Sequence, residues 1–187
     1  MDKLVIDIET SNTFADVGGE RNLKDLKISL IGVYSYDRDK FFCFDENQIH
    51  EFKPILQNAG LVIGFAINRF DIPVLDKHYD FNLFALKRLD LLEEIELKIG
   101  GRISLNVLAK TNLGIHKEHH GLEAVKMYRE GNLEELKNYC LNDVRLTRDL
   151  YELARRQGFL VVPDKTTGEL RKAEFNWKEE VLPATLF

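Results

Sequence analysis

The chain has 187 residues, of which 44% are hydrophobic and 30% are charged, a balance that is ordinary for a soluble protein with one well-formed core. Its formal net charge of -5 argues against a protein that coats nucleic acid by bulk electrostatics, because such binding needs clustered Lys and Arg. No apolar run approaches the roughly 18 residues of a membrane span, and no signal-peptide pattern opens the chain. We therefore expect no contact with a membrane.

The chain contains two cysteines, Cys43 and Cys140, which lie far apart in the sequence and belong to no paired motif. Isolated cysteines of this kind are typical of reduced thiols in the cytoplasm. We therefore expect a cytoplasmic protein, while the sequence leaves its oligomeric state open.

The first predicted element is a strand over residues 4–10, and it carries two acids, Asp7 and Glu9. Alternate side chains of a strand share one face, so these carboxylates lie side by side, about 6.6 Å apart at a rise of roughly 3.3 Å per residue. Either burial and repulsion raise their pKa until they are neutral, or a cation holds them ionised. Oxygen ligands favour Mg²⁺ or Mn²⁺, and the alternative is a strand end whose acids reach water.

Residues 11–26 show no hydrophobic periodicity and are expected to form a loop long enough to be functional. Residues 27–36 and 40–44 then predict an antiparallel hairpin. A helix over residues 46–58, ended by Gly60, and a short buried strand over residues 61–65 follow. Strand, helix and strand in this order imply a parallel crossover. The expected fold is α/β, with a mixed sheet of an antiparallel hairpin and parallel strands flanked by helices.

Asp71 follows the buried strand and lies between Phe70 and Ile72, where an unpaired acid is unfavourable. Taken alone, the residue is typical of a helix N-cap, since Asp is favoured there and Pro73 suits the first turn. The start of a helix at the carboxyl end of a strand is also where ligands collect in α/β sheets. Both interpretations can hold together.

A short strand over residues 87–92 is expected to run into a helix that ends at Gly100. Asp90 is interpreted as a capping residue at this junction and is left out of the site. Ser104 is expected to cap the next helix, which closes at Gly114. The segment 115–121 holds three of the five histidines but lacks the four convergent ligands of a zinc site, so a polar loop is predicted.

The last long helix is predicted from Asn132 to Gly158, with Asn132 and Glu135 as a capping-box-like start. Tyr139 and Asp143 are four residues apart, so they stack on one face of this helix, and that face borders its buried stripe. A solvated charge belongs on the opposite side. Asp143 is therefore interpreted as an inward-facing acid with a phenol one turn before it.

Beyond this helix, residues 159–162 and 170–177 predict a β-hairpin. The sequence does not decide whether it covers an edge of the sheet or extends a substrate groove. We expect a single domain over residues 1–158, with a C-terminal hairpin extension over residues 159–187 packed on it.

Together these residues resemble three motifs of the DEDD (DnaQ-like, RNase H-like) 3′-5′ exonucleases. Asp7-Ile8-Glu9-Thr10 is similar to the first motif, Phe70-Asp71-Ile72-Pro73 to the second and Tyr139-Cys140-Leu141-Asn142-Asp143 to the third. The resemblance spans residues 1 to about 157, in the order of the family, and implies an RNase H-like fold. The tyrosine sub-type (DEDDy) is indicated, because the histidine sub-type has His where this chain has Asn138. The chain looks most similar to the family-B polymerase-like and YprB-like branches.

The resemblance implies metal-dependent 3′-5′ exonuclease activity on DNA or RNA, at single-stranded 3′ ends, with two Mg²⁺ or Mn²⁺ ions. Asp7 would bridge both ions, Glu9 and Asp143 would hold the first, and Asp71 would support the second, partly through water. Tyr139 would orient the attacking water, because a phenol with a pKa near 10 is a poor base at neutral pH. A helicase or polymerase is a possible partner.

Three residues near these motifs are candidates for binding substrate: Thr10, Asn68 and Phe70. Phe70 and the backbone after Glu9 would stack on or position the terminal nucleotide. Many relatives have an Asn five residues before the second-motif Asp, where this chain has Ala66. This departure keeps open a rival function, a catalytically weak or silent nucleic-acid-binding or scaffold domain of the same fold.

A phosphatase of the haloacid dehalogenase type also begins with a strand and an Asp-x-Asp-x-Thr run. Glu9 departs from that run, and the sequence lacks the later Lys and Asp-Asp cluster of that chemistry. This alternative is therefore disfavoured.

Overall fold

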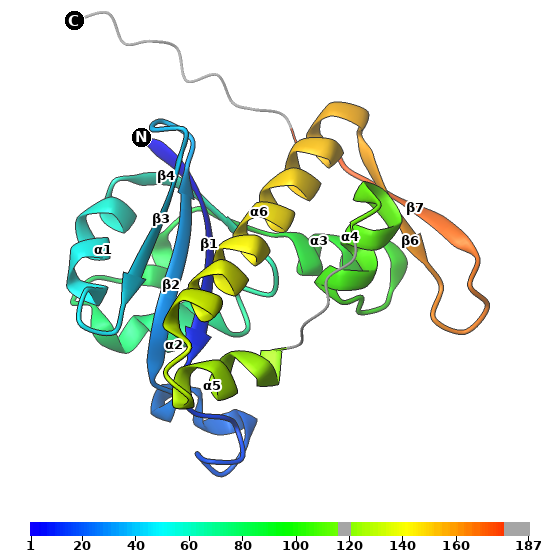
Figure 1. Cartoon of the computed structure of the whole chain (residues 1–187). Coiled ribbons are helices and arrows are strands. Elements are labelled where there is room, and N and C mark those ends of the chain that lie inside the picture. Colours follow the sequence, from blue (N-terminus) through cyan, green and yellow to red (C-terminus); the bar gives the residue numbers. More distant parts are fainter. Residues whose placement is uncertain (116–120, 178–187) are drawn as a thin grey trace, which may run out of the picture.

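The computed structural model describes residues 1–115 and 121–177, and its centre is a five-stranded sheet (Figure 1). The strands lie in the order β3-β2-β1-β4-β5. β1, β2 and β3 pair antiparallel, whereas β4 and β5 run parallel to β1. The mixed sheet expected from the sequence is confirmed. The strands are β1 (Asp2–Thr10), β2 (Ile28–Ser35), β3 (Lys40–Asp45), β4 (Ala59–Gly64) and β5 (Arg88–Asp90).

Helices cover both faces of the sheet. The long helix α6 crosses one face in contact with β1 and β2, while α1 and α2 pack on the other (Figure 1). The helices are α1 (Ile49–Gln57), α2 (Asp71–Leu75), α3 (Leu91–Ile99), α4 (Leu105–Leu113), α5 (Gly121–Arg129) and α6 (Leu133–Gln157), with short 3-10 helices η1 (Glu20–Asp25), η2 (Asp76–His78) and η3 (Leu83–Ala85). In the part of the chain that is described, no helix has the length and apolar character needed to cross a membrane.

The alternation of side chains along β1 places them in two different buried clusters. Leu4, Ile6 and Ile8 are buried in the cluster that includes α1 and α2. Val5 is buried in the second cluster, with residues of α3, α4 and α6. Because Asp7 has the same parity as Val5, this strand directs its acid toward the α6 face.

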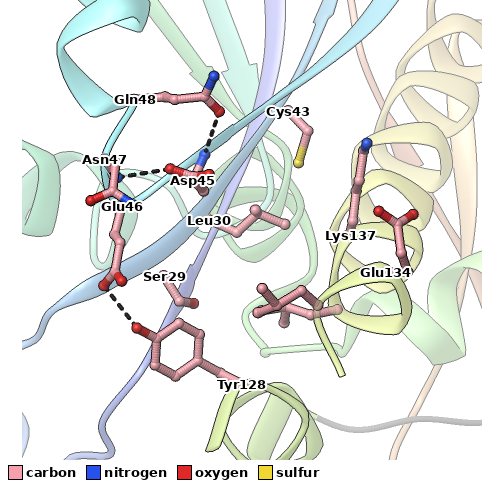
Figure 2. Close-up of a pocket in the computed structure, with 12 residues that line it drawn as sticks. Ser29, Leu30, Cys43, Asp45, Glu46, Asn47, Gln48, Tyr128, Glu134 and Lys137 are labelled. Carbon is pink, nitrogen blue, oxygen red and sulfur yellow. Dashed lines mark hydrogen bonds between the residues drawn. The ribbon is translucent and has the colours of Figure 1, made fainter. Parts of the chain in front are cut away.

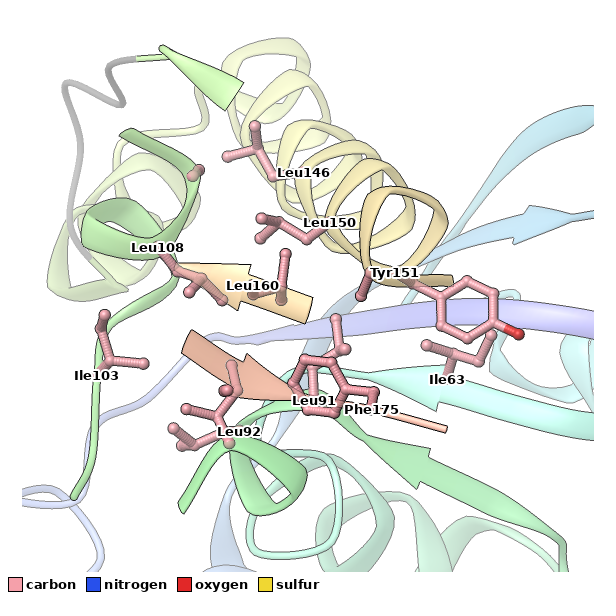
Figure 3. Close-up of a cluster of buried hydrophobic side chains, with 14 of the residues drawn as sticks. Ile63, Leu91, Leu92, Ile103, Leu108, Leu146, Leu150, Tyr151, Leu160 and Phe175 are labelled. Atoms are coloured by element: carbon pink, nitrogen blue, oxygen red, sulfur yellow. The ribbon is translucent and has the colours of Figure 1, made fainter. Parts of the chain in front are cut away.

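A C-terminal hairpin, also expected, shares the second cluster. It consists of β6 (Phe159–Pro163) and β7 (Leu170–Glu174), which pair antiparallel. Figure 3 shows Leu160 and Phe175 packed among residues of α3, α4 and α6. Beyond β7, the ring of Trp177 stacks on Phe175 at 4.3 Å between centroids, and its Nε1 donates a hydrogen bond to Glu94. The hairpin is therefore part of the same packed unit.

Several helix ends follow the expected chemistry. The Oγ of Ser104 accepts a hydrogen bond from the amide of Val107, which confirms the predicted cap of α4. Gly100 and Gly114 end α3 and α4 with φ of 73° and 69°, a left-handed conformation that glycine adopts without steric strain.

Other expectations about the elements are wrong. Helix α5 was not among the predicted elements. Gly60 lies inside β4 rather than ending α1. Asn132 precedes α6 but makes no side-chain cap, and its Nδ2 donates to Glu130 instead. The expected loop before β2 contains η1. Of the predicted histidine loop, residues 116–120 lie outside the described residues.

Candidate active site

The two acids of β1 lie opposite β2, next to an irregularity in the pairing. Asp7 pairs with Gly32 and Glu9 with Leu30, but Thr10 pairs with Ile28, so β2 has one extra residue at this point. Bulges of this kind are frequent beside functional sites, where they redirect side chains. The hydroxyl of Thr10 donates to the carbonyl of Asn12 at 2.9 Å, so it also helps to shape the loop that leaves β1.

A glycine in β2 allows α6 to approach these acids closely. A Cβ at Gly32 would lie 2.7 Å from the Sγ of Cys140, which is closer than two such atoms can come. The thiol of Cys140 is fully buried and lies 3.7 Å from Oδ2 of Asp7 and 3.6 Å from its carbonyl oxygen. The first half of α6 is thereby held directly over Asp7.

The same turn of α6 brings a phenol and a third acid to the site. Tyr139 and Asp143 are 7% and 8% exposed, and Glu9 on the facing strand is 8% exposed. Burial raises the pKa of the Tyr139 phenol, and the negative charges of Glu9, Asp143 and Asp7 raise it further. The phenol therefore keeps its proton at neutral pH and is a hydrogen-bond donor.

Asp71 joins the site through the backbone of β1. Its Oδ1 accepts a hydrogen bond from the amide of Ile8 at 3.0 Å, and the residue is 3% exposed. The pKa of Asp71 is raised to about 7, mainly by burial; the hydrogen bonds from backbone amides oppose the rise and the charge of Asp90 adds to it. The carboxyl is thus fixed beside the residue that separates Asp7 from Glu9.

The interpretation of Asp71 as a helix N-cap is wrong. Helix α2 begins at Asp71 itself, and the preceding Phe70 makes no side-chain cap. The side chain of Asp71 instead makes a tertiary contact, because its Oδ1 accepts a hydrogen bond from the amide of Ile8 in β1. Asp90, by contrast, does cap α3 by accepting from the amides of Leu92 and Glu93, as expected.

The candidate substrate residues of this region already have partners within the protein. The side-chain amide of Asn68 donates to Glu93 and accepts from Nε of Arg88 at 2.8 Å, so it belongs to a polar network beside α3. The half-buried ring of Phe70 meets Phe14 edge-on at 5.9 Å between centroids. The structure thus brings the acids and the phenol together but holds Asn68 in a separate network.

The donor set fits a hard divalent cation. Carboxylate oxygens of Asp7 and Glu9 and the Sγ of Cys140 all lie within 4.8 Å of one another. Paired carboxylates suit Mg²⁺ or Mn²⁺. Burial raises the pKa of the Cys140 thiol far above its usual range, so this group stays protonated and donates to Asp7 rather than binding metal. This contact could not be predicted from the sequence, because a buried Cys is ordinary on the apolar face of a helix.

A pocket of about 250 Å³ lies between the β2–β3 hairpin and the corner of α5 and α6 (Figure 2). Its charged lining residues are Asp45, Glu46 and Glu134 against Lys137, so it is acidic overall. The hydroxyl of Tyr128 donates to Glu46 at 2.8 Å across one side. An acidic pocket repels phosphate groups, so it does not suit a nucleic-acid backbone.

Comparison with protein families gives one match, to the RNase H superfamily, over residues 4–155. The matched segment contains the whole five-stranded sheet except its first two residues. It also contains the four acids and the phenol of the candidate site: Asp7, Glu9, Asp71, Asp143 and Tyr139. No curated protein matches the sequence significantly. The fold of this superfamily is of the nuclease type, and its members act on nucleic acid. The chain belongs to the RNase H superfamily.

Proposed function

We propose that the protein is a metal-dependent 3′-5′ exonuclease that hydrolyses phosphodiester bonds at single-stranded 3′ ends of DNA or RNA. The observation that carries the proposal is the convergence of acids from distant parts of the chain. Asp7 and Glu9 come from β1, Asp143 from α6, and Asp71 is joined to β1 through the Ile8 amide. Membership of the RNase H superfamily supports the proposal.

In the proposed mechanism, two Mg²⁺ or Mn²⁺ ions held by Asp7, Glu9, Asp71 and Asp143 would acidify the attacking water and neutralise the leaving 3′ oxygen. The protein's own contribution is to hold these carboxylates on rigid elements. Tyr139 donates a hydrogen bond that orients the attacking water, because its raised pKa excludes a role as base. We therefore propose the tyrosine (DEDDy) sub-type.

The alternative is a silent binding or scaffold domain of the same fold, and Ala66 is the residue that favours it. A pure binder gains nothing from a cluster of buried carboxylates, which repels phosphate unless cations are present. We therefore favour the enzyme. We place it in the cytoplasm, where a helicase or polymerase would supply its single-stranded ends.

The test is a time course with end-labelled single-stranded DNA and RNA in Mg²⁺ or Mn²⁺. Stepwise shortening from the 3′ end is expected, and a chelator or the Asp7→Asn substitution should abolish it. Asp149→Asn removes another acid from α6 and serves as the matched control. Binding without cleavage by the wild-type protein would contradict the proposal and favour the silent domain.

Replacing Tyr139 with Phe tests the role of the phenol separately. The variant should slow turnover while leaving metal affinity nearly unchanged, because the hydroxyl is not a proposed ligand. Loss of Mn²⁺ binding in this variant would contradict the role given to Tyr139.

A further inference from the structure

A second charged region lies away from the acids, where the end of α3 meets the C-terminal hairpin. A pocket of about 160 Å³ there is lined by the turn after α3 and the tip of the hairpin. Among the described residues that line it, Arg102, Lys165 and Arg171 are basic and Asp164 is acidic. This local excess of positive charge is opposite in sign to the net charge of -5 of the whole chain.

The basic groups of this pocket remain accessible to a ligand. Arg171 contacts Asp164 at 3.1 Å, yet its side chain is 54% exposed. The carboxylate of Asp164 also accepts hydrogen bonds from the amides of Thr166 and Thr167, which lower its pKa. Because a guanidinium has five N–H donors, Arg171 keeps donors for a second anion. Lys165 lies exposed in the turn of the hairpin.

Two arginines that share Glu96 relate this pocket to the chain segment that carries Asp71. Arg69 lies two residues before Asp71, and its Nη1 donates to Oε1 of Glu96 at 2.9 Å. Arg102 contacts the same oxygen at 3.2 Å. The side chains of Arg69 and Arg102 are 46% and 65% exposed. Glu96 thus holds together Arg69, which is close to Asp71 in the sequence, and Arg102, which lines the pocket.

We propose that Arg69, Arg102, Lys165 and Arg171 bind the phosphate backbone of single-stranded nucleic acid, on the 5′ side of the nucleotide at the acids. The direction of the strand rests on the proposed exonuclease function. The pocket suits a phosphate rather than a base, since its described lining residues include no aromatic ring for stacking. Bidentate guanidinium groups are well matched to phosphate oxygens. In this assignment the C-terminal hairpin extends the substrate groove.

The test compares two glutamine variants in a binding assay by fluorescence anisotropy, with Ca²⁺ in place of Mg²⁺ or Mn²⁺, because the acids bind a nucleotide only when a cation neutralises them and Ca²⁺ takes the same oxygen ligands. One variant combines Arg102→Gln, Lys165→Gln and Arg171→Gln. The other, Lys172→Gln, removes the neighbouring charge on β7, which lies over the ring of Phe159 at 4.1 Å and outside the pocket lining. The ligands are a labelled dinucleotide and a labelled single strand of about 12 nucleotides, within the site sizes of single-strand binders.

For the longer strand, the triple variant should bind roughly tenfold more weakly than the wild type. The slope of log affinity against log salt should fall by about 2, since each lost phosphate contact accounts for about 0.7 on single strands. Dinucleotide binding should not change, and Lys172→Gln should resemble the wild type. An unchanged slope in the triple variant, or an equal loss in Lys172→Gln, would overturn the proposal.

The outcomes separate this inference from the proposed function. Reduced strand binding by the triple variant, together with a wild-type protein that never cleaves, would contradict the exonuclease function and support the binding surface. Normal cleavage with unchanged strand binding by the triple variant would contradict the binding surface and leave the exonuclease function supported. If circular dichroism shows the triple variant to be unfolded, the single variant Lys165→Glu, at an exposed turn position, tests the binding surface instead. Its slope of log affinity against log salt should be smaller than that of the wild type by about 1.

Discussion

The contact between Cys140 and Asp7 ties the packing of α6 to a proposed metal ligand. Groups that hydrogen-bond to metal ligands orient them, and their loss commonly lowers metal affinity. A thiol is a weak donor, so we expect Cys140→Ala to weaken Mn²⁺ binding roughly three- to tenfold, at the low end of the usual range. Isothermal titration calorimetry with Mn²⁺ measures this change.

Cys43→Ala is the control for this experiment, because it removes the other thiol from the same side of the sheet. Its Mn²⁺ affinity should equal that of the wild type. Equal affinities in all three proteins would show that Cys140 fills space and does not position Asp7.

Asp71 predicts a pH dependence of stability in the metal-free protein. Because its pKa is raised to about 7 from the ordinary 3.8, the folded state holds a proton that the unfolded state has released. The free energy of unfolding should therefore fall as the pH rises from about 4 to 7, by at most about 1.4 kcal/mol per pH unit for one proton. Urea unfolding in chelator at several pH values measures the slope.

Asp71→Asn cannot titrate and should flatten this part of the profile. Saturating Mg²⁺ should flatten it too, because binding to the ionised carboxylate replaces the proton. A profile for Asp71→Asn that matches the wild type would assign the pH dependence to another group.

The close approach of α6 to β2 gives a prediction at the scale of elements. Gly32→Ala places a methyl group 2.7 Å from Sγ of Cys140 and 3.0 Å from Cγ2 of Val144, so α6 must shift. We expect a loss of roughly 1–3 kcal/mol of stability, typical of overpacking. Turnover should fall as well, since α6 carries Tyr139 and Asp143. Chemical unfolding and the exonuclease assay measure the two effects.

A double-mutant cycle tests the cause. In Gly32→Ala combined with Cys140→Ala, the sulfur is gone and the inserted methyl group has room on that side. The double variant should therefore recover part of the stability lost in Gly32→Ala, with a coupling energy of roughly 0.5–3 kcal/mol. Strictly additive losses would mean that Val144 or the backbone, and not Cys140, meets the new methyl group.

Elements with a long repeating pattern were predictable from the sequence, and those that depend on tertiary partners were not. β1 and α6 carry strong alternation or helical periodicity, so their existence and the faces of Asp7 and Asp143 followed from spacing alone. Helix α5 was not predicted, although α1, α3 and α4 have the same length of nine residues. It packs against β1 and α6, and such tertiary packing supplies most of the stability of a short helix.

The site was predictable to the same extent. Carboxylates in a buried strand or stripe stand out because an unpaired charge there is unfavourable. The carboxylate of Asp71 is held by a hydrogen bond from the backbone amide of Ile8. This bond could not be predicted from the sequence, because every residue except proline has a backbone amide. The glutamate and arginine that hold the side chain of Asn68 come from α3 and β5, and only the fold brings them to it.

For the molecule as a whole, buried like charges oppose folding until a cation neutralises them. A cation that binds only the folded state adds RT ln(1 + [L]/Kd), about 2.7 kcal/mol at a concentration one hundred times the Kd. For a domain of this size, that gain should raise the melting temperature by roughly 5–10 °C. Differential scanning fluorimetry in MgCl₂ measures the shift, and NaCl of equal ionic strength controls for general screening.

Asp7→Asn should remove most of this shift, and it should also raise the melting temperature of the metal-free protein, because one of the mutually repelling charges is gone. Asp149→Asn should keep the full response to Mg²⁺, because this acid is paired with Arg148 at 2.7 Å and, among the described residues, is not part of a group that could hold a metal ion. A shift of equal size in Asp7→Asn would place the stabilising cation elsewhere on the protein, and the proposed metal centre would lose its principal ligand.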